Sequence, residues 1–136
     1  ALNSVGKIPY YYGGKPSTAG LSGNHFASVT SPDYKGRILS GLDCSGWVNW
    51  VYWSVTGTHL PYEGTEGLRT LGRQVRRQDL KPGDIVVITG STPHVIMFLG
   101  FTSNGQIQCV HETGSANNVT IGVMNANWPY YRNLLD

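Results

Sequence analysis

The strongest constraint on the fold is a change of hydrophobic period near the middle of the chain. Between residues 44 and 57, apolar residues recur three or four positions apart, which is the period of an amphipathic α-helix. After the turn signal at residues 81–84, β-branched and aromatic runs of strand length follow one another. This order predicts an α+β fold, in which N-terminal helices pack on a C-terminal antiparallel β-sheet.

Local signals give the expected limits of these elements. Asp43 is expected to cap the first helix, and Gly57 to stop it. A second short helix is expected over residues 65–71, capped by Thr65. A tight turn at residues 103–105 is expected to join two strands. The expected strands are residues 85–88, 95–101, 107–112 and 119–124.

The length of 136 residues suits a single domain with one hydrophobic core. Residues 15–40 are rich in Ser, Gly, Thr and Pro, which predicts a long, partly ordered loop or a small insertion. Loops of that length are often functional. The sequence starts without Met and without a signal peptide, so we expect residues 1–136 to be a domain excised from a larger secreted protein, with other domains beside it.

Charge and hydropathy exclude two classes of partner. The formal charge of +2 is too weak to indicate nucleic acid. The arginines at 69, 73, 76 and 77 cluster in sequence and could face an anionic partner, but we expect them to form a solvated helix face. No apolar run approaches the roughly 20 residues that span a bilayer, so we expect no transmembrane segment.

Cys44 is the candidate nucleophile. The chain has one other cysteine, Cys109, and the two form either one disulfide or two free thiols. Cys44 falls in the first turn of the predicted helix, and a helix N-terminus stabilises a thiolate. A small core residue is the alternative interpretation. The flanking Asp43, Ser45 and Gly46 make this an unusual place for core filling.

His94 is the candidate partner of the thiol, because it begins an apolar strand directly after the loop at residues 90–93. A catalytic histidine is adjacent to its cysteine in space and not in sequence. His111 lies on the next strand, where it can hydrogen-bond the far nitrogen of His94 and fix its tautomer. His25 and His59 have no comparable setting and are expected to face solvent.

A zinc site is the competing interpretation of the same side chains. Structural zinc ligands are usually paired at short spacing. The four candidate ligands are scattered singly along the chain, which disfavours zinc: Cys44, His94, Cys109 and His111. We expect neither a metal nor an organic cofactor.

Four sequence blocks and a dipeptide occur in order: residues 10–14, 41–48, 80–86 and 94–100, and then Val110-His111. Together they resemble the NlpC-type cell-wall peptidases, papain-like bacterial cysteine enzymes that cut peptidoglycan stem peptides. The resemblance spans about residues 5–124. It implies one papain-like domain, with Cys44 as nucleophile, His94 as general base and His111 as the orienting third residue.

The resemblance also suggests three residues around the nucleophile. Tyr10 matches a tyrosine at the active-site rim, whose hydroxyl helps to hold the oxyanion. Asp43 and Ser45 match positions that contact the amino end of the substrate in some members. From the residues alone, Tyr10 can equally pack with its neighbours, Asp43 can be only a helix cap, and Ser45 can merely support the helix start.

The chain departs from the compact family pattern in three places. The segment 15–40 separates two of the shared blocks, which bears on cleft shape. Residues 101–108 lengthen the hairpin between His94 and His111, and Ile96 stands where a small residue is more usual.

The activity implied by the resemblance is cleavage of the amide between γ-D-Glu and the diamino acid of a stem peptide, through a thioester. The implied protein is a secreted or wall-associated monomer that acts on peptidoglycan. An N-acetylmuramoyl-L-alanine amidase or an acyl transferase would use the same Cys–His pair. A noncatalytic wall-binding module that stacks tryptophans on sugars, Trp128 among them, is a further alternative. Core packing explains Trp47, Trp50 and Trp53 better than sugar stacking does, because they share one predicted helix.

Overall fold

The computed structural model describes residues 2–6, 8, 10, 31–32, 38–39, 42–57, 60–61 and 64–134. Its helical elements are η1 (Leu2–Ser4), α1 (Cys44–Thr56), α2 (Thr65–Leu68) and η3 (Arg77–Asp79). Its strands are β1 (Ser31–Pro32), β2 (Ile38–Leu39), β3 (Arg73–Gln74), β4 (Ile85–Ile88), β5 (His94–Phe101), β6 (Ile107–Thr113), β7 (Asn118–Met124) and β8 (Tyr130–Asn133).

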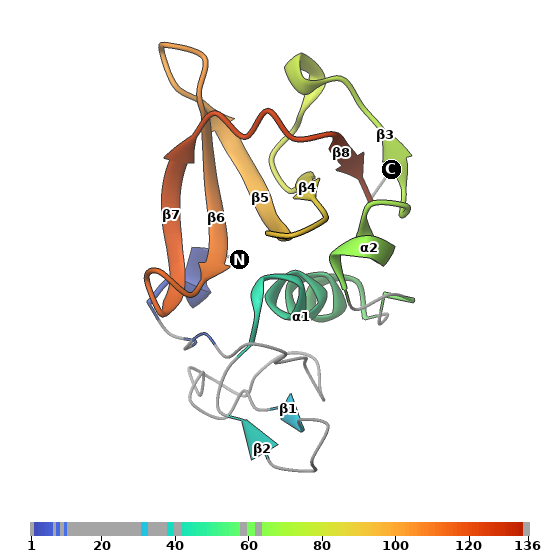
Figure 1. Cartoon of the computed structure of the whole chain (residues 1–136), viewed down its shortest axis with the longest axis vertical. Helices are drawn as coiled ribbons and strands as arrows, with labels where there is room; N and C mark the ends of the chain where they lie inside the picture. The colour runs from blue at the N-terminus through green and yellow to red at the C-terminus, as the bar shows by residue number, and fades with distance from the viewer. Residues whose placement is uncertain are drawn as a thin grey trace.

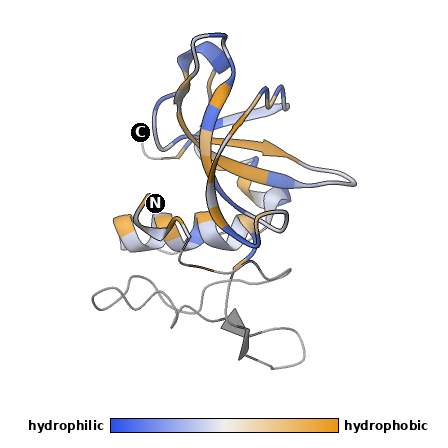
Figure 2. Cartoon of the chain, turned by 90° about the vertical axis from the view of Figure 1, so that its left-hand side faces the viewer, coloured by the Kyte–Doolittle hydropathy of each residue, from blue (hydrophilic) through white to orange (hydrophobic). Residues whose placement is uncertain are grey.

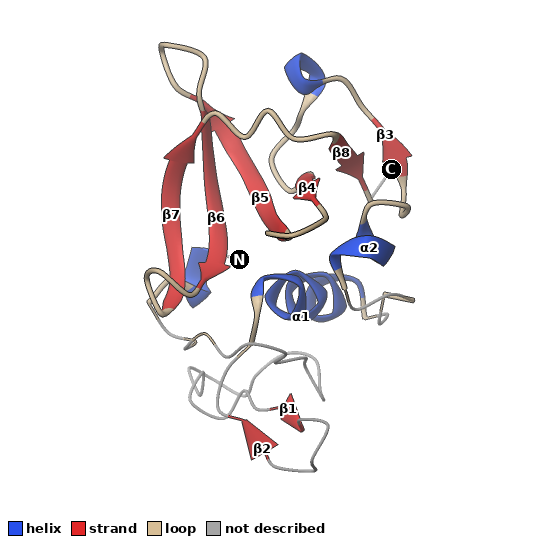
Figure 3. Cartoon of the chain, viewed as in Figure 1, coloured by secondary structure: helices blue, strands red, loops and turns tan. Residues whose placement is uncertain are grey.

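Six of these strands form one antiparallel sheet in the order β3-β8-β4-β5-β6-β7. The four strands predicted from the sequence are β4 to β7, and they form the expected meander (Figure 1). Helix α1 packs against β5 and β6. Helices α1 and α2 precede the six strands of this sheet in sequence. This order confirms the α+β architecture (Figure 3).

Helix α1 has the limits that its capping residues predict. The Asp43 carboxylate accepts a hydrogen bond from the Gly46 N–H at 2.7 Å. Gly57 adopts the left-handed conformation, with φ of 76°, and its N–H donates to the Trp53 carbonyl. Inside the helix, Trp47 is fully buried, and its indole N–H donates to the Ser4 hydroxyl at 2.9 Å. That bond ties the N-terminal segment to α1.

Alternate residues of β5 pack on opposite sides of the sheet. Val95 and Met97 join the cluster that contains α1, whereas Ile96 and Phe98 join a second cluster on the other face. Figure 2 shows hydrophobic residues running along the strands of the sheet. Since both faces of β5 are covered, this strand is a continuous apolar run and not an alternating one.

The second helix differs from its prediction. It ends at Leu68 and not at residue 71, and its N-cap is Gly64, without a side-chain cap. Gly72, with φ of +64°, then turns the chain into β3. A Cβ on Gly72 would lie 1.9 Å from the Asn133 carbonyl oxygen, so the chain passes very close to β8 here. This approach to β8 ends the helical segment early.

The arginines do not share one helix face, which corrects that expectation. Arg69 follows α2 and pairs with Glu66 at 3.0 Å, while Arg76 pairs with Asp79 at 2.8 Å. Arg73 lies in β3. Arg77 opens η3, and its guanidinium donates to the Asn125 carbonyl at 2.6 Å.

Part of the predicted insertion is described. Within residues 15–40, β1 and β2 pair as a short antiparallel ladder. His25 and His59, which we expected to face solvent, lie outside the described residues. Among the described helices, none is long and apolar enough to cross a membrane.

Candidate active site

Cys44 is the first residue of α1 and is 8% exposed. Both cysteines are free thiols, which resolves the choice between one disulfide and two thiols. The Asp43 carboxylate that caps the helix also accepts a hydrogen bond from the Ser45 hydroxyl at 3.2 Å. Asp43 and Ser45 are both buried. They therefore brace the backbone on either side of the thiol, whether or not they also contact a substrate.

His94 and His111 lie side by side, as their positions on the hairpin predict. Nε2 of His94 and Nδ1 of His111 are 2.8 Å apart, which is hydrogen-bond distance. The ring centroids are 5.0 Å apart in an edge-to-face arrangement. Their roles in catalysis stay predictions, but the bond leaves Nδ1 of His94 available for a second partner.

The direction of that bond decides the tautomers of both rings. If Nδ1 of His94 is to accept a thiol proton, its own proton must sit on Nε2, where it donates to Nδ1 of His111. His111 then carries its proton on Nε2. Burial, together with the adjacent His111, lowers the pKa of His94 to about 4, and burial also lowers the pKa of His111. Both rings are consequently neutral near pH 7, the state in which His94 can act as a base.

Helix α1 packs against β5 and β6, the two strands that carry the histidines. Cys44 belongs to the same buried cluster as Val95 and Val110, which are the sequence neighbours of His94 and His111. The residue after His111 is Glu112, and the charge of Asp43 helps to raise its pKa, so the segment before Cys44 is close to β6. The start of α1 is thus close to β5 and β6, and the pairing of the Cys44 thiol with His94 stays a prediction.

Tyr10 lies at the border of this region. Its backbone forms a parallel bridge with Leu42, two residues before Cys44, and its N–H donates to the Asn117 carbonyl at 3.3 Å. Its ring packs against Gly114, where a Cβ would lie 3.4 Å from the ring. Tyr10 is therefore held between the approach to α1 and the turn after β6. Its neighbours Tyr11 and Tyr12 lie outside the described residues.

The structure adds residues that the sequence did not assign to the catalytic site. Trp128, in the connection between β7 and β8, packs edge-to-face on the His94 ring with centroids 5.9 Å apart. Gly122 of β7 lies against His111. Glu112 is fully buried. Of these three residues, only Glu112 could have been recognised from the sequence, because it is an acidic residue at the end of an apolar strand run.

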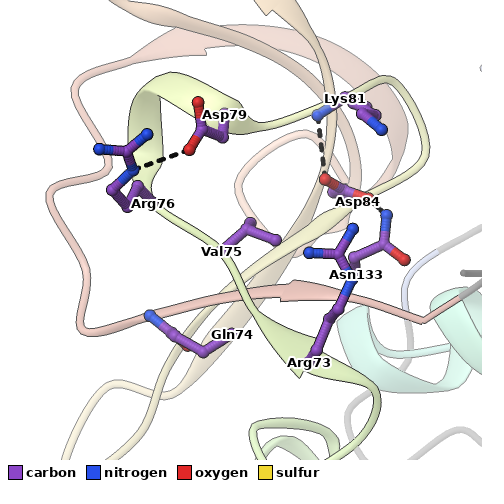
Figure 4. A pocket seen from close by; sticks show the side chains of 8 residues that line it. All are labelled: Arg73, Gln74, Val75, Arg76, Asp79, Lys81, Asp84 and Asn133. Carbon is purple, nitrogen blue, oxygen red and sulfur yellow. Dashed lines mark hydrogen bonds and ion pairs between the residues drawn. The ribbon is translucent and has the colours of Figure 1, made fainter.

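A separate pocket of about 500 Å³ lies at the β3–β8 edge of the sheet (Figure 4). Its lining includes Arg73, Arg76, Lys81 and Asp84, and none of the candidate catalytic residues. Asp84 is already engaged there by the Lys81 backbone N–H and the Asn133 amide. Among the described residues, no group of three or more His, Cys, Asp or Glu side chains could hold a metal ion.

Comparison with known proteins places the chain in a family. The sequence pattern of the NlpC/P60 family matches residues 6–135. The chain belongs to the NlpC/P60 family. The NlpC/P60 domain of RipD from Mycobacterium tuberculosis superposes with a TM-score of 0.64 at 24% identity, covering 98% of this chain and 91% of that one. This likeness supports the papain-like fold that the sequence resemblance implied. RipD is described as non-catalytic, adapted to peptidoglycan binding.

Two curated relatives are more similar in sequence. Gamma-DL-glutamyl hydrolase of Bacillus subtilis is 32% identical over 123 residues, covering 90% of this chain and 23% of that protein. Murein DD-endopeptidase MepS/Murein LD-carboxypeptidase of Escherichia coli is 35% identical over 99 residues, covering 71% of this chain and 48% of that protein. The chain thus spans a quarter to a half of the length of these relatives.

Proposed function

We propose that this NlpC/P60 domain is a cysteine peptidase of peptidoglycan stem peptides, acting at the bacterial cell wall. The observation that carries the proposal is the hydrogen bond between His94 of β5 and His111 of β6, because α1, which begins at Cys44, packs against these two strands. An oriented imidazole near a helix-terminal thiol is what nucleophilic acyl transfer requires. The names of the two curated relatives, a glutamyl hydrolase and a murein peptidase, support this substrate class.

The first half of the reaction forms a thioester. Nδ1 of His94 takes the Cys44 proton as the sulfur bonds to the amide carbon, and His111 accepts the hydrogen bond of the resulting imidazolium. Backbone N–H groups at the start of α1, with the Tyr10 hydroxyl, hold the oxyanion. The carbon–nitrogen bond then breaks as His94 returns the proton to the leaving amine.

The second half restores the enzyme. His94 takes a proton from water as the water oxygen attacks the thioester carbon, and the sulfur leaves as the Cys44 thiolate. The acid product departs, and the proton on His94 is shared again with the thiolate. No step needs a metal ion or an organic cofactor.

The scissile bond is the amide between γ-D-Glu and the diamino acid. The test is to incubate the protein with purified muropeptides and weigh the products by mass spectrometry. We expect two fragments whose masses sum to the substrate plus one water, with a new free amine on the diamino acid. Release of the intact stem peptide from the glycan would indicate an amidase instead, and a product carrying an added group would indicate a transferase.

Replacing the two histidines separately should divide their roles. We expect His94→Ala to lower turnover by about 10²–10⁴-fold, the usual contribution of a general base. His111→Ala should lower it less, because His94 keeps its nitrogen but loses the group that orients it. Initial rates on muropeptides, with circular dichroism to check folding, provide the measurement. Full activity of the His111 variant would exclude His111 from the site.

A noncatalytic binding module is the second candidate, favoured by the similarity to RipD. The aromatic side chains argue against sugar stacking by α1, because Trp47 is fully buried and Trp50 is 7% exposed. Trp128 packs on His94. Retention on insoluble peptidoglycan with no soluble product would favour the module over the enzyme.

A further inference from the structure

Gly122 of β7 lies directly against the imidazole of His111. A Cβ built on Gly122 would lie 3.1 Å from Nε2 of His111, 3.7 Å from its Cδ2 and 3.8 Å from the Cys109 sulfur. Carbon atoms pack best at about 3.5–4.0 Å, so a methyl group at this position would press on the ring.

The backbone gives no other reason for a glycine at this position. Gly122 is not among the glycines with positive φ, and it pairs in regular register with Cys109 on β6. Glycine inside a strand costs roughly 0.5–1 kcal/mol relative to alanine. In strands it often marks a site where another group must approach closely. Here that group is the His111 ring.

The His111 ring cannot move away from Gly122 without disturbing His94. His111 is 7% exposed, and the nitrogen opposite Nε2 holds Nε2 of His94 at 2.8 Å. Because an imidazole is rigid, pressure on Nε2 is passed to the hydrogen bond at Nδ1. A change at Gly122 therefore reaches His94 through one aromatic ring.

His94 has a second ring neighbour besides His111. The Trp128 ring stands edge-to-face on His94, with an interplanar angle of 78°. Each imidazole thus has a second contact: His111 with Gly122, and His94 with the Trp128 indole. Neither ring can follow a displacement of the other without losing one of these contacts.

We propose that Gly122 is a positioning residue, whose missing side chain seats His111 so that His111 aims His94. The kinetic part of this inference rests on the proposed function, whereas the ring geometry does not. A side chain at Gly122 would meet His111 and the sulfur of Cys109, and we expect its effect on catalysis to pass through His111.

The variant that tests the proposal is Gly122→Ala, with Gly100→Ala as the matched control. Gly100 also lies in a strand of the same sheet, without a positive φ, and a Cβ there would meet no atom of the described chain within 4 Å. Side-chain ¹⁵N spectra of the histidines report tautomer and hydrogen bonding without any substrate. We expect Gly122→Ala to shift the signals of both rings and Gly100→Ala to leave them unchanged.

Kinetics supply the second readout. The His111 ring must give by a few tenths of an ångström, and a misplacement of about 1 Å can cost on the order of 10²-fold in rate, so we expect kcat of Gly122→Ala to fall by about 10-fold at most. KM should change little, because the substrate does not touch Gly122. In a His111→Ala background the same glycine change should have no further effect on kcat, because the ring that transmits it is gone.

The spectra and the kinetics distinguish a failure of the Gly122 proposal from a failure of the proposed function. Unchanged histidine signals in Gly122→Ala, or an equal loss of kcat with and without the His111 ring, would overturn the proposal. If Gly122→Ala does not fold, Gly122→Ala/His111→Ala should fold as stably as His111→Ala alone, and its failure to do so would equally refute the idea. A wild-type protein without Cys44-dependent cleavage would refute the proposed function, and the spectra would still test the seating of His111.

Discussion

Cys44→Ala is expected to abolish cleavage of muropeptides, with a loss of about 10⁴-fold or more in kcat. The loss should be this large because the alanine cannot form the thioester on which both halves of the reaction depend. The chain has one other thiol, Cys109, which is fully buried, and burial raises its pKa to about 11. Cys109 is thus protonated at neutral pH and cannot substitute for Cys44.

Cys109→Ala is the matched control. It removes a sulfur from the chain but leaves the thiol at the start of α1, so most of the activity should remain. Thiol alkylation gives a measurement without substrate: Cys44, at the helix terminus, should react faster than Cys109. Equal product from wild type and Cys44→Ala would show that Cys44 is not the nucleophile, whatever the relative rates of alkylation.

The elements that the sequence predicts well are those decided within a few residues. Asp43 and Gly57 bound α1 because a side-chain cap and a left-handed glycine act on their own neighbours. Strand β4 has the predicted limits, and β5 begins one residue early, at His94. Apolar runs of this kind are recognisable because both faces of these strands are buried.

The elements that were missed depend on contacts made far along the chain. Strands β3 and β8 are short, and they form by pairing residues about 60 positions apart, such as Arg73 with Asn133. The end of α2 follows from the close passage of Gly72 by Asn133. No local pattern in residues 65–74 contains that information.

The candidate site divides in the same way. His94 and His111 could be paired in advance because one hairpin joins their strands, and a hairpin sets which strands are adjacent. Gly122 and Trp128 could not be assigned to the site in advance. Gly122 reaches His111 from β7, and Trp128 reaches His94 from the connection after β7. A glycine or a tryptophan in such positions has no periodic signature.

Glu112→Gln is expected to stabilise the protein, by an amount that grows with pH. Glu112 is fully buried, and neither of its carboxylate oxygens has a hydrogen-bond partner among the described residues. Burial, with a smaller contribution from the charge of Asp43, raises the pKa of Glu112 to about 9. The folded protein therefore holds this carboxyl in its neutral form at pH 7.

The sign of the effect follows from proton binding. An unfolded glutamate has a pKa of about 4.3, so between about pH 4.3 and pH 9 the unfolded chain has released a proton that the folded chain keeps. The stability of wild type then falls as the pH rises, by at most about 1.4 kcal/mol per pH unit. Below about pH 4.3 this loss of stability is absent, and above about pH 9 it no longer grows. Glutamine does not titrate, so Glu112→Gln does not have this pH-dependent loss of stability.

Urea unfolding at a series of pH values measures this difference. The free energy of unfolding of Glu112→Gln minus that of wild type should rise steadily from about pH 5 to about pH 9 and then level off. Glu66→Gln is the matched control, because Glu66 is exposed and pairs with Arg69 at the surface. A pH-independent difference for Glu112→Gln would mean that Glu112 is ionised in the folded protein, beside Asp43 and the start of α1.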